Sequence, residues 1–248
     1  MSAEPAQAVS RNLNTFFYFG TLNSLRTLHA MSPQWILVLE TSVIDASLVL
    51  ACDGEINARA NFTSERSQEV DLFPPLQEIL ASLPSGERLS SIVIGTGPGS
   101  YNGARVGIAA AQAIAQTHNC PVAGLCSFEG VTQLRDAPIS WAVGDARRGS
   151  FFLMELIEGK TSSAPELLEH SEFLSRLASC DGPIATFENP DRLKLPKGHQ
   201  VVESAATAET LLDAWLSRSS TEQKAIQKIP AEAFYLRPPH ITKAKPKS

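Results

Sequence analysis

Apolar residues recur along the early chain in short runs that are typical of buried strands. Residues 35–39 and 46–51 are mainly apolar and of strand length, whereas residues 55–62 alternate, as a half-exposed strand does. Asp53-Gly54 separates the last two runs, and both positions of such a hairpin turn favour positive φ. The pattern therefore predicts an antiparallel three-stranded meander.

Helix and strand patterns alternate after the meander. A helix is predicted over residues 67–81, and its apolar face carries Val70, Phe73, Leu76, Ile79 and Leu80. Pro74 and Pro75 lie inside this helix and predict a kink or a restart. A buried strand at 91–95, a helix at about 104–117 and a strand at 122–124 follow. The order βββαβαβ predicts a mixed sheet with helical crossovers.

The second half of the chain repeats the first at an offset of 105 residues. This offset aligns the strand-end carboxylates Glu40 and Asp145, and it aligns the acidic-Gly turns at 53–54 and 158–159. Helices at about 165–178 and 204–216, with a strand at 184–187 between them, complete the second half. Chance similarity of two hairpins is the alternative, but the matched offset favours duplication. We expect an α/β fold with a first lobe at 34–138 and a smaller, truncated lobe at 139–240.

Composition and charge narrow the function classes. The 248 residues carry a net charge of −5, which excludes a strongly basic nucleic-acid binder but not a local basic patch. No stretch approaches about 18 apolar residues, so we expect no membrane span. The four scattered cysteines form no C-x-x-C pair, which predicts no zinc site and a reduced, cytoplasmic protein. The motifs H-E-x-x-H and G-x-S-x-G are both absent, which disfavours two common classes of hydrolase.

The two ends of the chain are predicted to lie outside the fold. Residues 1–33 form an extension that we expect to be disordered or not native, since Met31 leads directly into the first strand pattern. A transit peptide and a partner-binding arm are the alternatives for this extension. The tail at 241–248 carries Lys243, Lys245 and Lys247 without an acid. A solvated end and a weak contact with a tRNA backbone are both open for the tail.

A glycine-rich segment between a predicted strand and a helix carries the most information. Residues 95–108 read GTGPGSYNGARVGI, and backbone N–H groups at such a position can hold an anion. The spacing fits neither a Walker A loop nor a dinucleotide fingerprint, and a tight strand-to-helix connection is the alternative. Ser100 is interpreted as a helix cap rather than a nucleophile. Arg105 is predicted in the first helical turn, where a cation requires an anionic partner, either structural or a bound phosphate.

The glycine loop resembles that of the TsaB family, also called YeaZ, whose pattern is roughly G-x-G-P-G-S-F-T-G-x-R-x-G. Tyr101 and Asn102 replace Phe and Thr, and the matching residues are Gly97, Pro98, Gly99, Ser100, Gly103, Arg105 and Gly107. Three more segments, at 39–41, 145–147 and 235–237, resemble the family's I-D-T, D-A-R and Y-L-R. The duplicated lobes also resemble the superfamily of actin, heat-shock ATPases and sugar kinases. That plan implies strand ends that face a cleft, here Glu40, Thr41, Asp145 and Arg147.

The resemblance implies a role in making N6-threonylcarbamoyladenosine at position 37 of tRNAs that read codons starting with A. In that system a TsaD subunit transfers the threonylcarbamoyl group, and the TsaB subunit is its non-catalytic scaffold. The implied partners are a TsaD-like catalytic subunit, a TsaE-like ATPase and, indirectly, tRNA. Residues 64–71 contain no histidine, so we expect no metal site of the TsaD kind. No cofactor of its own and no catalytic residue are expected, and a nucleotide at the complex interface is left open.

The helix at 104–115 consists almost entirely of small and apolar residues, which lets another helix approach closely. Ordinary burial against the sheet is the alternative. The resemblance favours a partner interface through Val70, Phe73, Gly107, Ala111 and Ile114, and a homodimer is open for the chain alone. Ala111→Glu is then expected to abolish complex formation and leave the monomer folded.

Two other functions compete with the scaffold role. The first is a small-molecule phosphotransferase of the same superfamily, for which Glu40 could hold Mg²⁺ although it is one methylene longer than the usual Asp. For Asp145 and Arg147, a local salt bridge or turn cap is the simpler interpretation. The second is an M22-like peptidase, for which the sequence offers no nucleophile–base pair.

Overall fold

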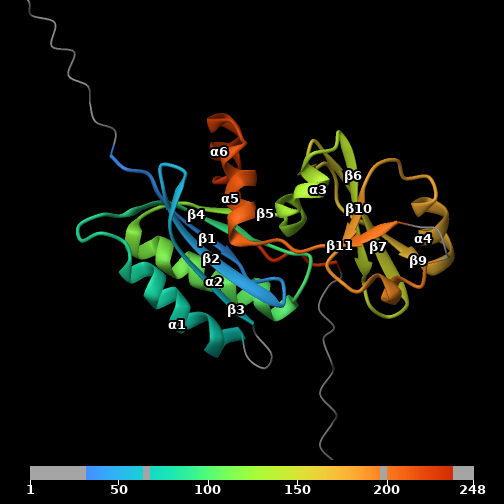
Figure 1. Cartoon of the computed structure of the whole chain (residues 1–248), viewed down its shortest axis with the longest axis horizontal. Coiled ribbons are helices and arrows are strands. Elements are labelled where there is room, and N and C mark those ends of the chain that lie inside the picture. Colours follow the sequence, from blue (N-terminus) through green and yellow to red (C-terminus); the bar gives the residue numbers. More distant parts are fainter. Residues whose placement is uncertain (1–31, 64–67, 196–199, 237–248) are drawn as a thin grey trace, which may run out of the picture. The chain divides into compact units, whose positions relative to one another are not determined.

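The computed structural model describes residues 32–63, 68–195 and 200–236 (Figure 1). The described residues from Pro33 onward belong to one compact unit. The basic tail at 241–248 and nearly all of the predicted extension at 1–33 lie outside the described residues, so both stay predictions.

The first sheet begins with the predicted meander. Its strands are β1 (Trp35–Glu40), β2 (Asp45–Cys52), β3 (Glu55–Thr63), β4 (Leu89–Gly95) and β5 (Val122–Leu125), in the order β3-β2-β1-β4-β5. β1 pairs antiparallel with β2 and parallel with β4. Asp53 and Gly54 have φ of 51° and 87°, so the hairpin turn is confirmed.

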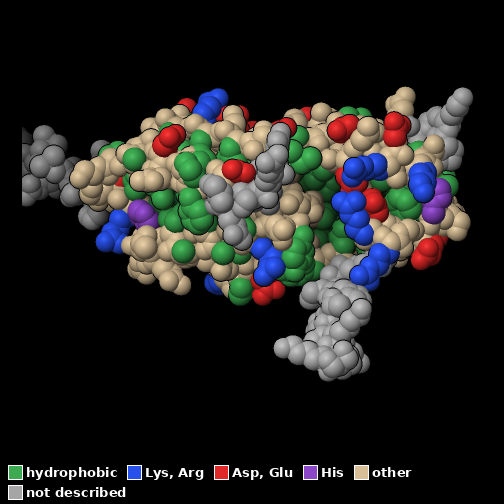
Figure 2. Space-filling view, turned by 90° about the horizontal axis from the view of Figure 1, so that it is seen from below, with side chains coloured by type: hydrophobic (Ala, Val, Ile, Leu, Met, Phe, Trp, Pro, Cys, Tyr) green, Lys and Arg blue, Asp and Glu red, His purple; other side chains and the backbone are tan. Residues whose placement is uncertain are grey.

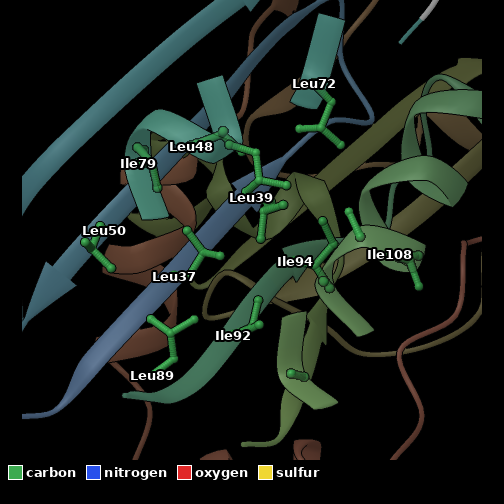
Figure 3. Packing of buried hydrophobic residues seen from close by; sticks show 14 of the residues in the cluster. Leu37, Leu39, Leu48, Leu50, Leu72, Ile79, Leu89, Ile92, Ile94 and Ile108 are labelled. Carbon is green, nitrogen blue, oxygen red and sulfur yellow. The ribbon is translucent and has the colours of Figure 1, made fainter. Parts of the chain in front are cut away.

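Helices α1 (Gln68–Ala81) and α2 (Tyr101–His118) cover one face of this sheet (Figure 1). Leu37, Leu39 and Ile94 of the sheet pack with side chains of both helices in one apolar core (Figure 3). α1 continues through both prolines as one helix, so the predicted restart is wrong. Leu72 rather than Phe73 completes its buried face, and Phe73 is 58% exposed.

The opposite face of the first sheet is covered by α5 (Ala208–Leu216), from much later in the chain. Val38 and Val93 of the sheet pack with Leu211 and Trp215 of α5. The helix begins at Thr207, which forms a capping box with Thr210. The chain thus returns to the first sheet after building the second, and the prediction of two consecutive lobes did not include this return. The unpredicted α6 (Ser220–Ile226) follows.

The second sheet repeats the topology of the first. Its strands are β6 (Ile139–Asp145), β7 (Ser150–Ile157), β8 (Lys160–Thr161), β10 (Ile184–Thr186) and β11 (Val201–Glu203), in the order β11-β10-β6-β7-β8. β6 pairs antiparallel with β7 and parallel with β10, as β1 does with β2 and β4. The turn at Glu158 and Gly159 has φ of 50° and 69°, which matches the turn of the first hairpin. The duplicated α/β architecture is therefore confirmed.

The helix predicted at 165–178 is wrong in its first part. Residues Glu166–Glu169 form β9, which pairs with β7, and only His170–Leu177 form helix α4. The sheet edge offers backbone partners to residues 166–169, and these tertiary hydrogen bonds outweigh a weak helical pattern. Three short elements complete the described fold: η1 (Ser127–Gly130), α3 (Thr132–Arg135) and η2 (Pro190–Leu193).

Candidate functional site

The glycine loop ends where α2 begins, at Ser100. The Ser100 hydroxyl accepts a hydrogen bond from the Gly103 N–H at 3.2 Å, which confirms the helix-cap interpretation. Because α2 starts three residues earlier than predicted, Arg105 lies in its second turn, and the reasoning from a first-turn cation is wrong. The Arg105 guanidinium lies over the Tyr101 ring, 5.2 Å from its centroid, and the Tyr101 ring contacts that of Tyr235.

The loop packs directly against the turn that follows β1. The Ser100 N–H donates to the Ser42 carbonyl at 2.5 Å, and the Thr41 hydroxyl donates to the Gly103 carbonyl at 2.8 Å. A Cβ on Gly99 would lie 2.2 Å from the Ser42 carbonyl oxygen, and a Cβ on Gly107 would lie 2.1 Å from the Thr41 hydroxyl. The glycines are therefore required by close backbone packing.

Several backbone N–H groups of the loop are used inside the protein. The N–H of Gly97, which precedes a cis bond to Pro98, donates to the Ser127 hydroxyl at 3.0 Å, and the Ser127 N–H donates to the Gly97 carbonyl. The Ala104 N–H donates to the Ser100 carbonyl. These bonds favour the tight strand-to-helix connection over the anion site, which stays a prediction.

Glu40 at the end of β1 is enclosed beneath this loop. One carboxylate oxygen accepts hydrogen bonds from the Ser42 N–H and hydroxyl, both at 2.7 Å, and the other has no partner among the described residues. A Cβ on Gly95 would lie 2.0 Å from that second oxygen. Burial raises the pKa of Glu40, although hydrogen bonds from Ser127 and Ser42 oppose the shift. Glu40 and Thr41 are thus covered by the loop, contrary to the expectation that they face an open cleft.

Asp145 and Arg147 occupy the equivalent position in the second sheet. The Asp145 carboxylate accepts from the Arg147 N–H at 2.7 Å and lies 3.5 Å from its guanidinium. The local salt bridge and turn cap are therefore confirmed. Both residues are accessible to solvent, unlike Glu40.

A buried ionic network connects three distant segments of the chain. Glu129 of η1 pairs with Arg218, which follows α5, and their side chains are only 6% and 4% exposed. Glu129 also accepts hydrogen bonds from the Thr161 N–H and hydroxyl at 3.2 and 2.6 Å. Beside it, Lys160 pairs with Glu222 at 2.5 Å. The sequence carried no signal for this network, because Glu129 and Arg218 are 89 residues apart.

This network lines one wall of a pocket of about 540 Å³. Ile226, Ile229 and Pro230 contribute apolar surface to the pocket, and Thr96 and Gly124 lie along the first sheet. The Glu129–Arg218 and Lys160–Glu222 pairs connect η1 and β8 to the segment around α5 and α6. The contacts hold the two halves of the described fold together at this point.

The residues of the predicted partner face on α1 and α2 lie in different environments. Ala111 is 0% exposed and Gly107 is buried, because both lie on the face of α2 that packs against the sheet. The premise that Ala111 is exposed is therefore wrong, and Ala111→Glu is now expected to disrupt the core. Ile114 is half-buried, Phe73 is exposed, and the side chain of Val70 lies outside the described residues.

The exposed face of α2 is shifted around the helix from the predicted one. Between the exposed Tyr101 and Thr117 near its ends, six exposed residues form this face: Asn102, Arg105, Ala109, Gln112, Ala113 and Gln116. Figure 2 views the molecule from below Figure 1, the side of α1 and α2, and apolar or uncharged surface predominates in its left part. Arg105 is the one charged member of the six.

The described residues contain neither a metal-binding cluster nor a membrane-spanning helix. No group of three His, Cys, Asp or Glu side chains there is arranged to hold a metal ion. No helix in the same part of the chain combines the length and apolarity needed to cross a bilayer.

The repeated sheet order is the duplicated plan that the resemblance to the actin, heat-shock ATPase and sugar-kinase class implies. The model of the family described as TsaD, tRNA N6-adenosine threonylcarbamoyltransferase, matches residues 63–226. A curated relative from Haemophilus influenzae, the tRNA threonylcarbamoyladenosine biosynthesis protein TsaB, is 27% identical over 175 residues, which cover 68% of this chain and 74% of the relative. The Escherichia coli protein of the same name is 32% identical over 127 residues, 48% of this chain and 54% of the relative.

Solved structures support the same assignment at the level of the fold. YeaZ from Pseudomonas aeruginosa superposes with a TM-score of 0.60 at 19% identity, covering 81% of this chain and 99% of that one. A second Pseudomonas aeruginosa structure, described as similar to peptidase YEAZ, gives a TM-score of 0.61 at 21% identity over 82% of this chain and all of that one. The chain belongs to the TsaB/YeaZ family.

Proposed function

We propose that this chain is a non-catalytic scaffold subunit that pairs with a TsaD-type subunit to transfer threonylcarbamoyl to N6 of adenosine 37 in tRNA. Family membership assigns the chain to threonylcarbamoyladenosine modification of tRNA. The scaffold role and the heterodimer are the parts that we add. The complex would work in the cytoplasm, and a TsaE-type ATPase would dock on the pair. We expect no cofactor bound by this chain alone, and a nucleotide at the complex interface stays open.

The observation that carries the proposal is the enclosure of Glu40. A phosphotransferase of this class needs a strand-end carboxylate that reaches Mg²⁺ and water. Glu40 is instead covered by the glycine loop, and its second carboxylate oxygen occupies the space that a side chain at position 95 would fill. Burial also raises the pKa of this carboxyl group, which disfavours the charged form that a metal requires. The kinase alternative therefore lacks an accessible acid at the end of β1, and no described residues form the metal group of a metallopeptidase.

The exposed face of α2 is the surface that we propose for the partner. Ala109 and Ala113 lie one helical turn apart and permit close approach of another helix. Phe73 on α1 contributes an exposed aromatic side chain, and Tyr101 with Arg105 adds residue types that dominate binding energy at interfaces. A homodimer through the same face is the expected competitor when the partner is missing.

Ala113→Glu tests this interface. The side chain is exposed, so the variant should fold normally, while a charge placed between two close-packed helices should abolish co-purification with the TsaD-type partner. Ala178→Glu is the matched control, because it makes the same substitution at an exposed position at the end of α4. This variant should bind the partner normally. Normal co-purification of Ala113→Glu would exclude this face as the interface.

The scaffold role needs a separate measurement. Reconstituted modification of tRNA should depend on this chain and should persist in Glu40→Gln, because Glu40 does not reach the surface. ATP turnover or peptide cleavage by this chain alone would contradict the proposal.

A further inference from the structure

Two loops with exposed arginines lie side by side at one edge of the second sheet. β6 and β10 are parallel neighbours, with Ala142 opposite Ala185, so their carboxyl ends meet at the same edge. The turn after β6 carries Arg147 and Arg148, and η2 after β10 carries Arg192. Ligands of open α/β sheets bind outside the carboxyl ends of the strands. We call these three side chains the arginine surface.

The turn after β6 holds its arginines in a defined position. Arg147, Arg148 and Gly149 all have positive φ, of 66°, 56° and 78°. The Ala146 N–H donates to the Ser150 carbonyl at 2.9 Å, and the Asp145 carboxylate holds the Arg147 N–H at 2.7 Å. Positive φ at two successive non-glycine residues is uncommon and costs free energy, so the surrounding bonds must impose it. The turn therefore presents two adjacent guanidinium groups from a fixed backbone.

The acids near the arginine surface neutralise it only in part. Asp145 lies 3.5 Å from the Arg147 guanidinium, and Glu188 lies 3.8 Å from that of Arg192. The arginine side chains are 70% and 61% exposed in these pairs, and such solvated pairs contribute little free energy. Arg148 forms no ion pair with any described residue. Asp191 of η2 is a third acid and the neighbouring Lys194 a fourth cation, both exposed. Four cations thus face three acids, which leaves positive charge available to a ligand.

Glu188 is also a weak counter-charge. Its carboxyl group is half-buried, and one oxygen has no hydrogen-bond donor among the described residues. Burial raises the pKa of Glu188, and the nearby Asp145 raises it further, although Arg147 acts in the opposite direction. A phosphate group would replace this poorly solvated carboxylate as the partner of the guanidinium groups.

We propose that the arginine surface binds the phosphate backbone of the tRNA that the complex modifies. Planar guanidinium groups form paired hydrogen bonds with phosphate oxygens, which lysine cannot reproduce. A chain with a net charge of −5 needs a local excess of positive charge to approach RNA, and the arginine surface supplies one. Figure 2 shows Lys and Arg side chains interspersed with acidic ones over the second lobe, in the right part of the view. The inference rests on the proposed function, because that function supplies the RNA.

The test measures tRNA binding by the complex as a function of salt. Arg147→Gln/Arg148→Gln should lower the affinity roughly tenfold per arginine at about 0.1 M salt and reduce the salt slope by about 0.7–0.9 per arginine. Arg147→Lys/Arg148→Lys retains the charge and should keep the slope while losing part of the affinity. Arg59→Gln/Arg176→Gln removes two exposed arginines from other elements, and should behave as the unmodified chain.

The same samples separate failure of this inference from failure of the proposed function. Size-exclusion chromatography reports whether the complex forms, and filter binding of this chain alone at low salt reports the arginine surface without the partner. An unchanged salt slope in Arg147→Gln/Arg148→Gln would overturn the inference, even if the complex forms normally. The inference would also be overturned if this variant lost binding of an ATPase subunit but kept binding of tRNA. That result would make the arginine surface a contact for an acidic protein. Absence of any complex would refute the proposed function. Filter binding would still show whether the arginine surface binds tRNA.

Discussion

The buried pair of Glu129 and Arg218 allows a quantitative test of the tertiary structure. Arg218→Met keeps most of the side-chain volume and removes the charge, leaving the Glu129 carboxylate enclosed with only the Thr161 hydrogen bonds. Breaking one side of such a pair typically costs about 3–5 kcal/mol, because a buried charge remains uncompensated. At about 2–4 °C per kcal/mol for a domain of this size, the melting temperature should fall by roughly 6–20 °C.

Urea unfolding at neutral pH measures this cost, and the chain supplies a matched control. Arg59 and Glu209 form an ion pair whose side chains are 61% and 42% exposed, so Arg59→Met should cost less than about 1 kcal/mol. The double variant Glu129→Gln/Arg218→Met removes both charges and should recover part of the loss. If Arg218→Met costs no more than Arg59→Met, the pair is not buried and the contact between the two halves of the fold is wrong.

Two further changes test the core and the enclosed acid. Ala111→Glu places an unpaired charge at a fully buried site, so the free energy of unfolding should fall by roughly 3 kcal/mol or more, and a stable monomer in thermal melting would contradict the burial. Glu40→Gln tests the raised pKa of Glu40. The folded state binds the carboxyl proton of Glu40 more tightly than the unfolded state does. The stability of the unmodified chain should therefore fall as pH rises from about 4.5 through the raised pKa. The variant lacks this loss, so its stability relative to the unmodified chain should increase over that range in urea titrations, and a difference independent of pH would refute the reasoning.

Local patterns were sufficient for most elements of the first half. The meander, the Asp53-Gly54 turn and the Ser100 cap depend on neighbouring residues, so composition and spacing alone predict them. The offset between the two halves likewise predicted a duplication, which the repeated sheet order confirms. The family followed from short motifs that are read directly along the chain.

The face that each helix buries depended on the packing of the whole fold. Ala111 was expected on an exposed partner face and is buried, because small and apolar residues surround most of α2 and periodicity cannot rank its faces. The strand β9 also replaced part of a predicted helix, because an edge of the second sheet supplied its hydrogen bonds.

The sequence by itself determined the α/β class, the duplication and the family, since each follows from short local patterns and their spacing along the chain. Only the tertiary structure decided that Glu40 is enclosed, that Glu129 meets Arg218, and that α5 returns to the first sheet. The physical reason is the same in each case. Burial and ion pairing depend on distances between residues far apart in the sequence, and these distances exist only once the chain has folded.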